Sequence, residues 1–210
     1  MSKKVIVSLT TTPNRIPYLH RTLKSLQNQK LNIDSIELNV PYEYRRDDLG
    51  KVQLDLIPDG FEIYRCADFG PATKIVPTLK RYAAEDVMII YCDDDRIYDP
   101  NWALRLANAH SKSGGACIFE EGADIPYFLR TVVKDWVYRV KRVVSLGVWS
   151  PFKVDRLKTE IVEGFGGVLV TPRMFDNFVY DIPNECFFVD DIWLSANLSR
   201  NNIPKVYSGR

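Results

Sequence analysis

The hydrophobic pattern of the chain alternates short apolar runs with longer stretches of helical periodicity. Apolar runs, which are typical of buried strands, cover 5–9, 35–40, 61–65, 87–92, 116–119 and 161–170. Apolar residues spaced as on one face of a helix cover 17–29, 75–82, 101–113 and 190–200. This alternation predicts an α/β domain, and 210 residues suit one such domain better than two small ones.

Three consecutive carboxylates, Asp93, Asp94 and Asp95, follow directly on the apolar run 87–92. Adjacent carboxylates repel one another and cost stability when they are desolvated without a counter-charge. In open α/β sheets, ligands bind outside the carboxyl ends of the strands, where this triplet would lie. Hard oxygen ligands suit Mg²⁺ or Mn²⁺, so we predict a divalent-metal site. The alternative is a solvated acidic turn that caps the next helix.

Two loops have residues that suit an anionic or nucleotide ligand. The loop 10–15 reads Thr-Thr-Thr-Pro-Asn-Arg and offers hydroxyls, backbone N–H groups and Arg15. An ordinary turn with a solvated Arg15 explains it equally well. The loop 67–74 ends in Lys74, in the first turn of the predicted helix, where a cation opposes the helix dipole. We therefore interpret Asp68 and Lys74 as ligand-binding residues, with a plain surface loop as the alternative.

The second half of the chain adds glycines and another acidic pair. Gly164-Phe-Gly-Gly167 precedes a buried strand, where glycines allow another molecule to approach the backbone or form a bulge. Asp190 and Asp191 begin a predicted helix; one is expected to cap it. The other is a candidate base, because the positive end of the helix dipole keeps a carboxylate ionised. The stretch 124–149 alternates aromatic, β-branched and basic residues and predicts strands or a flap over a sugar or diphosphate.

Composition narrows the class of protein. The net charge of +1 gives no bulk attraction to nucleic acid or to a membrane surface. No apolar run approaches the ~20 residues that span a bilayer, and the apolar start is too short for a signal peptide. We expect a cytoplasmic protein with reduced thiols, since the four cysteines show no C-x-x-C spacing. We interpret His20 and His110 as structural or exposed. We also expect that the chain could be one domain of a longer protein.

Together these motifs resemble the metal-dependent nucleotide-sugar glycosyltransferases of the GT-A fold, close to inverting family 2. The similarity lies in the loops 10–15 and 68–74, the Asp triplet with Ile97, Tyr98 and Pro100 after it, the glycines 164–167 and the Asp190–Asp191 pair. It implies a single-domain, Rossmann-like GT-A fold whose central, mostly parallel mixed β-sheet is flanked by helices. The nucleotide-binding part would cover about 1–100 and the acceptor-binding part about 101–210. A narrower resemblance is to the amino-terminal glycosyltransferase domain of capsid-glycosylating proteins of large viruses.

The resemblance also implies a role for each motif. Asp95 would hold one divalent ion, Mn²⁺ or Mg²⁺, with Asp93 as a second metal ligand, and Asp94 would face the ribose. Asp191 would be the catalytic base, with Asp190 as the alternative. The nucleotide would contact Thr10, Thr11, Thr12, Arg15, Asp68, Gly70, Pro71, Lys74, Asp93 and Asp94.

Two features depart from the family's pattern. The second predicted strand ends at Pro41 without the usual acidic turn, so uracil recognition would fall to Asp68 or other residues. No late histidine is present as an extra metal ligand, so Asp95, the diphosphate and water would hold the ion.

The resemblance implies transfer of a sugar from a nucleoside diphosphate sugar, UDP-linked, to a hydroxyl of a glycan or glycoprotein, with inversion at the anomeric carbon. A sugar nucleotidyltransferase is a rival, although it would need a Gly-rich, Lys-containing triphosphate loop that 10–15 does not provide. A third hypothesis is a non-catalytic nucleotide-sugar-binding module in which the acidic pair only caps a helix.

Overall fold

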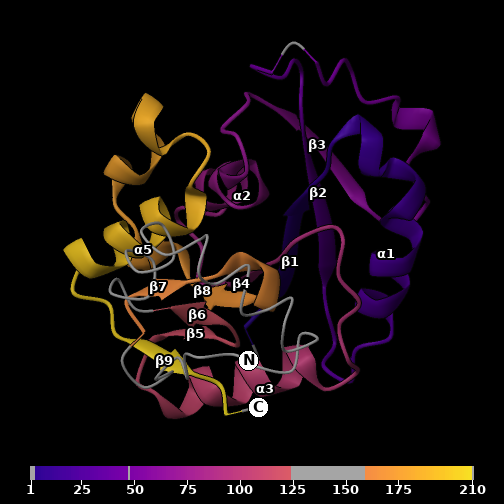
Figure 1. The fold of residues 1–210 in the computed structure, drawn as a ribbon. Helices are drawn as coiled ribbons and strands as arrows, with labels where there is room; N and C mark the ends of the chain where they lie inside the picture. The colour runs from indigo at the N-terminus through magenta and orange to yellow at the C-terminus, as the bar shows by residue number, and fades with distance from the viewer. Residues whose placement is uncertain (1–2, 47, 124–158, 210) are drawn as a thin grey trace, which may run out of the picture.

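The computed structural model describes residues 3–46, 48–123 and 159–209, so the prediction for 124–149 lies outside the described residues. Among them, seven strands form one sheet in the order β3-β2-β1-β4-β8-β5-β9 (Figure 1). The strands are β1 (Val5–Thr10), β2 (Ser35–Pro41), β3 (Glu62–Cys66), β4 (Met88–Tyr91), β5 (Cys117–Phe119), β8 (Val168–Val170) and β9 (Lys205–Tyr207).

The sheet is mostly parallel with one reversed strand. β8 is antiparallel to both of its neighbours, β4 and β5, whereas the other neighbouring pairs are parallel. The short strands β6 (Gly122–Ala123) and β7 (Ile161–Val162) form a separate antiparallel pair. The predicted α/β class and the mostly parallel mixed sheet are confirmed.

Helices cover both faces of the sheet (Figure 1). On one face, alternate residues of β1 and β4 pack against α1 (Leu19–Gln27) and α3 (Trp102–Lys112). On the other face, the intervening residues pack against α2 (Val76–Arg81) and α5 (Asp190–Arg200). Side chains of a strand point alternately to its two faces, which is why continuous apolar runs such as 87–92 are needed here.

Short 3-10 turns replace parts of the predicted helices. The first predicted helix begins as the 3-10 turn η1 (Pro13–Tyr18) before α1. The turn η3 (Ala72–Lys74) precedes α2, and Ile75 between them has φ −132°, outside the helical range. The prediction that Lys74 lies in the first turn of that helix is therefore wrong. Three further turns are η5 (Gly164–Gly166), η7 (Asn177–Tyr180) and η8 (Asn184–Cys186). Two more, η2 (Leu54–Leu56) and η6 (Pro172–Met174), lie elsewhere.

Cysteine and histidine residues play the structural parts expected of them. All four cysteines are free thiols. His110 is buried with its ring nitrogen 2.9 Å from the carbonyl oxygen of Ala116, and His20 is exposed. Within the described ranges, no helix has the length and apolar character needed to cross a bilayer.

Gly167 allows the glycine turn η5 to approach the core. Its φ of +91° is in the left-handed region, and a Cβ there would lie 2.3 Å from the ring of Trp102. The indole nitrogen of Trp102 donates a hydrogen bond to the carbonyl oxygen of Gly166 at 2.8 Å. Trp102 therefore fixes η5 against α3, and any side chain at position 167 would displace it.

Replacing Gly167 by alanine should lower the free energy of unfolding by more than the ~1–2 kcal/mol of left-handed strain, because the Trp102 ring must also move. Gly114→Ala is the matched control, since Gly114 has φ +67° but a Cβ there would meet nothing within 4 Å. Urea denaturation of both variants measures the difference. Equal losses would show that the contact with Trp102 contributes nothing.

Candidate active site

One pocket of about 520 Å³ opens where the carboxyl ends of β1 and β4 meet the start of α5. Every residue predicted for the site except Asp95 lines it. Its walls are Thr10, Thr11, Thr12, Asn14, Arg15, Tyr44, Arg46, Leu49, Asp68, Gly70, Pro71, Lys74, Cys92, Asp93, Asp94, Phe187, Phe188, Asp190 and Asp191. The pocket thus joins loops from the first hundred residues to the segment that leads into α5.

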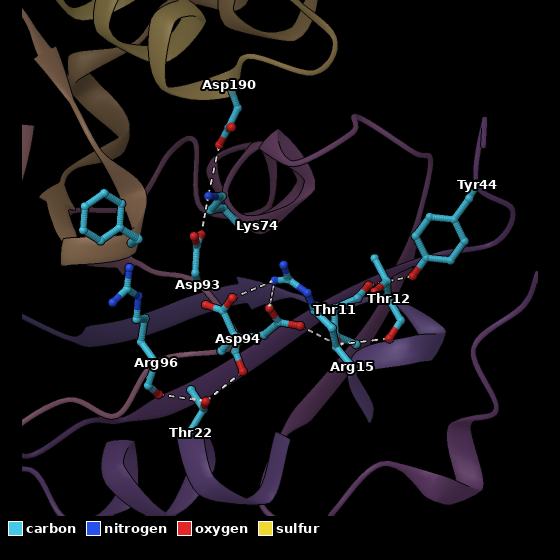
Figure 2. Close-up of polar contacts among 12 residues, drawn as sticks. Thr11, Thr12, Arg15, Thr22, Tyr44, Lys74, Asp93, Asp94, Arg96 and Asp190 are labelled. Atoms are coloured by element: carbon cyan, nitrogen blue, oxygen red, sulfur yellow. Dashed lines mark hydrogen bonds and ion pairs between the residues drawn. The ribbon is translucent and has the colours of Figure 1, made fainter. Parts of the chain in front are cut away.

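The side chains of β4 point alternately to the two faces of the sheet, and this alternation continues into Asp93 and Asp94. Tyr91 packs on the face of α2 and α5, and Cys92 packs on the face of α1 and α3. Asp93 then accepts a hydrogen bond from Lys74 Nζ at 2.5 Å, whereas Asp94 accepts from Thr11 and Arg15 (Figure 2). Asp93 and Asp94 therefore have different cationic partners, which reduces their mutual repulsion.

Asp94 ties the loop after β1 to the end of β4. Its side chain is 3% exposed and accepts from Thr11 Oγ1 at 2.6 Å and from Arg15 Nη1 at 2.6 Å. Thr22 of α1 donates to its backbone carbonyl at 2.7 Å. Burial raises the pKa of Asp94, and the hydrogen bonds from Thr11 and Arg15 oppose that rise. The predicted contact of Asp94 with a ribose stays a prediction.

Lys74 is a buried cation at the floor of the pocket, 5% exposed. Its ammonium lies 2.5 Å from Asp93 and 3.1 Å from Asp190, as Figure 2 shows. Burial alone disfavours its charge, but Asp190, Asp93 and Asp191 outweigh burial and raise the pKa of Lys74. Lys74 therefore stays charged and links the end of β4 to the first residue of α5.

Asp191 differs from its neighbour Asp190 in exposure and in bonding. Its Oδ1 accepts from the backbone N–H of Gly164 at 2.9 Å, and its side chain is half-buried. Burial, followed by the charge of Asp190, raises the pKa of Asp191 to about 7, although Lys74 opposes the rise. A carboxyl group that exchanges its proton near neutral pH is suited to general acid–base chemistry.

The expectation that one of the two acids caps α5 is wrong. Val189 is the N-cap residue, and no side chain caps the helix. The carboxylate of Asp190 is directed to Lys74 and that of Asp191 to Gly164 instead. Both still benefit from the positive end of the helix dipole, because they lie in the first turn.

Asp95 and Asp68 lie at the margins of the site. Asp95 is outside the pocket wall, about half exposed, with Oδ2 3.5 Å from Arg15 Nη1. The carboxylate oxygens of Asp68 accept from the backbone N–H groups of Arg45 at 2.7 Å and Gly70 at 2.8 Å. Asp68 thus shapes its loop in addition to lining the pocket.

Several wall residues, Tyr44, Phe187 and Phe188 among them, were not predicted from the sequence. Tyr44 donates its hydroxyl hydrogen to the carbonyl oxygen of Thr11 at 2.7 Å, which places its ring beside the loop after β1. The available signal was an aromatic residue in the charged stretch 42–51 after the second strand. Phe187 and Phe188 come from the segment before α5, and Arg45 stacks on Phe187 at 4.3 Å. No local pattern distinguishes these phenylalanines from core residues.

The donor set fits a metal ion that is shared with a diphosphate. Five carboxylates and three cationic side chains line the pocket, so an anionic diphosphate needs an added cation there. Among the described residues no group of three or more possible ligand side chains forms a metal cage. Mg²⁺ is usually bound through one or two carboxylates plus substrate phosphates, an arrangement that Asp95 can serve. Asp93 is less available, because Lys74 already holds it.

Several solved structures share this fold. The sequence matches no protein-family model and no curated protein. A solved structure of TarS (residues 1–349) from S. aureus is similar with a TM-score of 0.57 at 14% identity, covering 100% of this chain and 59% of that one. A mannosyltransferase from Pyrobaculum calidifontis, in complex with GDP-Man and Mn²⁺, gives 0.56 at 13% identity, with 99% and 55% covered.

A third solved structure extends the same comparison. Glucosyl-3-phosphoglycerate synthase from Mycobacterium tuberculosis, in complex with Mn²⁺, UDP-glucose and phosphoglyceric acid, gives a TM-score of 0.53 at 13% identity, with 99% and 70% covered. At these identities the likeness shows the fold alone, which is the GT-A fold of glycosyltransferases. The chain spans about three fifths of the TarS fragment.

The raised pKa of Asp191 predicts a measurable pH dependence of stability. Its folded pKa of about 7 lies above the ordinary 3.8, so the folded state holds a proton that the unfolded state has lost between these values. Stability should therefore fall as the pH rises from about 4 to about 7. Asp191→Asn should remove part of that fall, as followed by urea denaturation at several pH values. Parallel curves for the two proteins would contradict the assignment.

Proposed function

We propose that the protein is a metal-dependent inverting glycosyltransferase. It would move a sugar from a nucleoside diphosphate sugar, UDP-linked, to a hydroxyl of a glycan or glycoprotein. The observation that carries the proposal is the shared pocket, in which the acids after β4 and the acids at the start of α5 face one another within a GT-A fold. Solved neighbours with UDP, UDP-glucose or GDP-Man bound, two of them with Mn²⁺, support the donor class.

The nucleotide half of the pocket suits a nucleoside diphosphate. Thr10, Thr11 and Thr12, together with Tyr44, form a wall with hydroxyls and one aromatic ring. Asp68, Gly70 and Pro71 border the same space and would contact the base. Arg15 is about half exposed and can extend its guanidinium to a phosphate while it remains bonded to Asp94.

Asp95 is the residue that would hold Mn²⁺ or Mg²⁺, with Asp93 as the second candidate. The bound ion would act as a Lewis acid that stabilises negative charge on the departing diphosphate. The residues of the chain supply the rest: Asp94 and Arg15 fix the loop beside the phosphates, and Lys74 neutralises the carboxylate of Asp93. Positioned charges of this kind supply a large part of the rate acceleration in many enzymes.

The acceptor half supplies the base. Asp191 would take the proton of the acceptor hydroxyl as its oxygen bonds to the anomeric carbon, and the bond from that carbon to the diphosphate oxygen breaks. Attack from the side opposite the leaving group inverts the anomeric centre. General base catalysis contributes typically ~10²–10⁴-fold. Asp190 is the poorer base, because it is 7% exposed and paired with Lys74.

The rival functions have weaker support. A sugar nucleotidyltransferase needs a triphosphate loop, whereas 10–15 runs into η1 and directs Arg15 to Asp94. A non-catalytic binding module does not need a carboxyl group with a pKa near 7 in its pocket, which Asp191 has. Family 2 membership and the narrower resemblance to viral capsid-glycosylating proteins remain predictions.

Free UDP released from a panel of UDP-sugars, with Mn²⁺ and with or without glycan acceptors, tests the function. The expected result is donor hydrolysis or transfer that rises with pH around 7, because Asp191 must lose its proton to act. Asp191→Asn should lower turnover by ~10²-fold or more, while calorimetry shows unchanged UDP binding.

Each rival predicts a different outcome of the same assay. Pyrophosphate release from a nucleoside triphosphate and a sugar phosphate would favour a nucleotidyltransferase. UDP binding without turnover by the wild-type protein would favour a binding module. Full turnover in Asp191→Asn would reassign the base. Glu185→Gln, a change at an exposed acid in η8 before α5, is the control and should leave turnover unchanged.

A further inference from the structure

Lys74 touches two elements that the proposed reaction needs close together. Its ammonium contacts Asp93, directly after β4, and Asp190, the first residue of α5. Its side chain is 7% exposed, and that of Asp190 is 9% exposed. Removing one partner of a buried ion pair leaves the other charge buried and uncompensated, so this contact constrains where α5 begins relative to the sheet.

Gly164 packs against both Lys74 and Asp191. A Cβ at position 164 would lie 2.8 Å from Lys74 Nζ and 3.4 Å from Asp191 Oδ1. The backbone N–H of Gly164 donates to the same oxygen of Asp191. The ammonium, the glycine and the carboxylate of Asp191 are therefore packed together, and a displaced Lys74 would disturb Asp191 through this contact.

Buried hydrogen bonds also hold the backbone of Lys74 in place. Ser8 of β1 donates to the carbonyl oxygen of Lys74 at 2.6 Å, and Ser8 and Thr78 share a hydrogen bond of 2.7 Å. The amide of Asn39 donates to both hydroxyls, at 3.1 and 2.9 Å. These residues are fully buried, so their network is rigid and gives Lys74 one position.

We propose that Lys74 and Asp190 are a positioning pair that holds the start of α5 against β4 and sets the charge around the carboxylate of Asp191. This inference rests on the proposed function, in which Asp191 is the base. Neither member of the pair needs to touch the reacting atoms. They act through Asp191, whose position and ionisation they control.

Lys74 and Asp190 shift the pKa of Asp191 in opposite directions. The groups that face Asp191 are Asp190 on its own helix, Lys74 from η3, Tyr91 of β4, Asp93 after β4 and the N–H of Gly164. Besides burial, which raises the pKa of Asp191, the negative charges of Asp190 and Asp93 raise it, and Lys74 and the Gly164 N–H lower it. Removing Lys74 or Asp190 should therefore move the pKa of Asp191 in opposite directions.

Three variants test the proposal: Lys74→Met, Asp190→Asn and the double variant. The pH midpoint of transfer should move up by ~1 unit in Lys74→Met and down by a similar amount in Asp190→Asn, with partial cancellation in the double variant.

In Asp190→Asn at its optimal pH, kcat should fall ~10-fold or more while KM for the donor changes little, because Asp191 is no longer held in place. Lys80→Met removes an exposed charge from α2, the helix that follows η3, and is the matched control.

Carboxyl ¹³C NMR of Asp191 measures the titration midpoint of this residue without an activity assay. Its titration midpoint should move in opposite directions in the two single variants. Asp190→Asn keeps the shape of the side chain and an oxygen that accepts hydrogen bonds. It therefore tests the positioning role of the pair even if Lys74→Met does not fold. Midpoints and kcat that stay at wild-type values in Asp190→Asn would overturn the proposal. A wild-type protein without transfer would overturn the proposed function instead, and the NMR shifts would still decide the role of the pair.

Discussion

The contact of the Lys74 ammonium with Asp93 and Asp190 is the interaction on which the pocket depends. Taking ions out of water costs several kcal/mol each, and mutual attraction offsets this only when geometry and hydrogen bonding are good. Here the acids come from two distant parts of the chain, and one lysine is shared between them. Without that cation, the carboxylates at the end of β4 and at the start of α5 would repel one another.

Close backbone approach is the second constraint on the pocket. Gly164 leaves room for the lysine, and Gly70 leaves room for the segment before α5, since a Cβ at position 70 would lie 2.2 Å from the carbonyl oxygen of Phe187. Gly70 has φ +61°, which few other residues adopt. Both glycines lie where the first hundred residues meet the later ones. The division into nucleotide-binding and acceptor-binding parts stays a prediction, but the pocket wall draws on both.

Most of the strands, and many of the residues that line the pocket, could be predicted from the sequence because both depend on local patterns. A strand buried on both faces needs a continuous apolar run, and polar residues at the ends of such runs gather at one edge of a parallel sheet. This explains why Thr10, Asp93 and Asp94 could be placed together. The partners of Lys74, the lack of a side-chain cap on α5 and the wall residue Phe187 depend on contacts between distant segments, which no local pattern records.

The most direct test of the account is a crystal structure grown with UDP and Mn²⁺, in which the anomalous scattering of manganese locates the ion. The account predicts one manganese peak bound to Asp95 and to the diphosphate, with the uridine between Tyr44 and Asp68 in the pocket described above. Nucleotide bound elsewhere on the molecule, or manganese with no contact to Asp95 or Asp93, would contradict it.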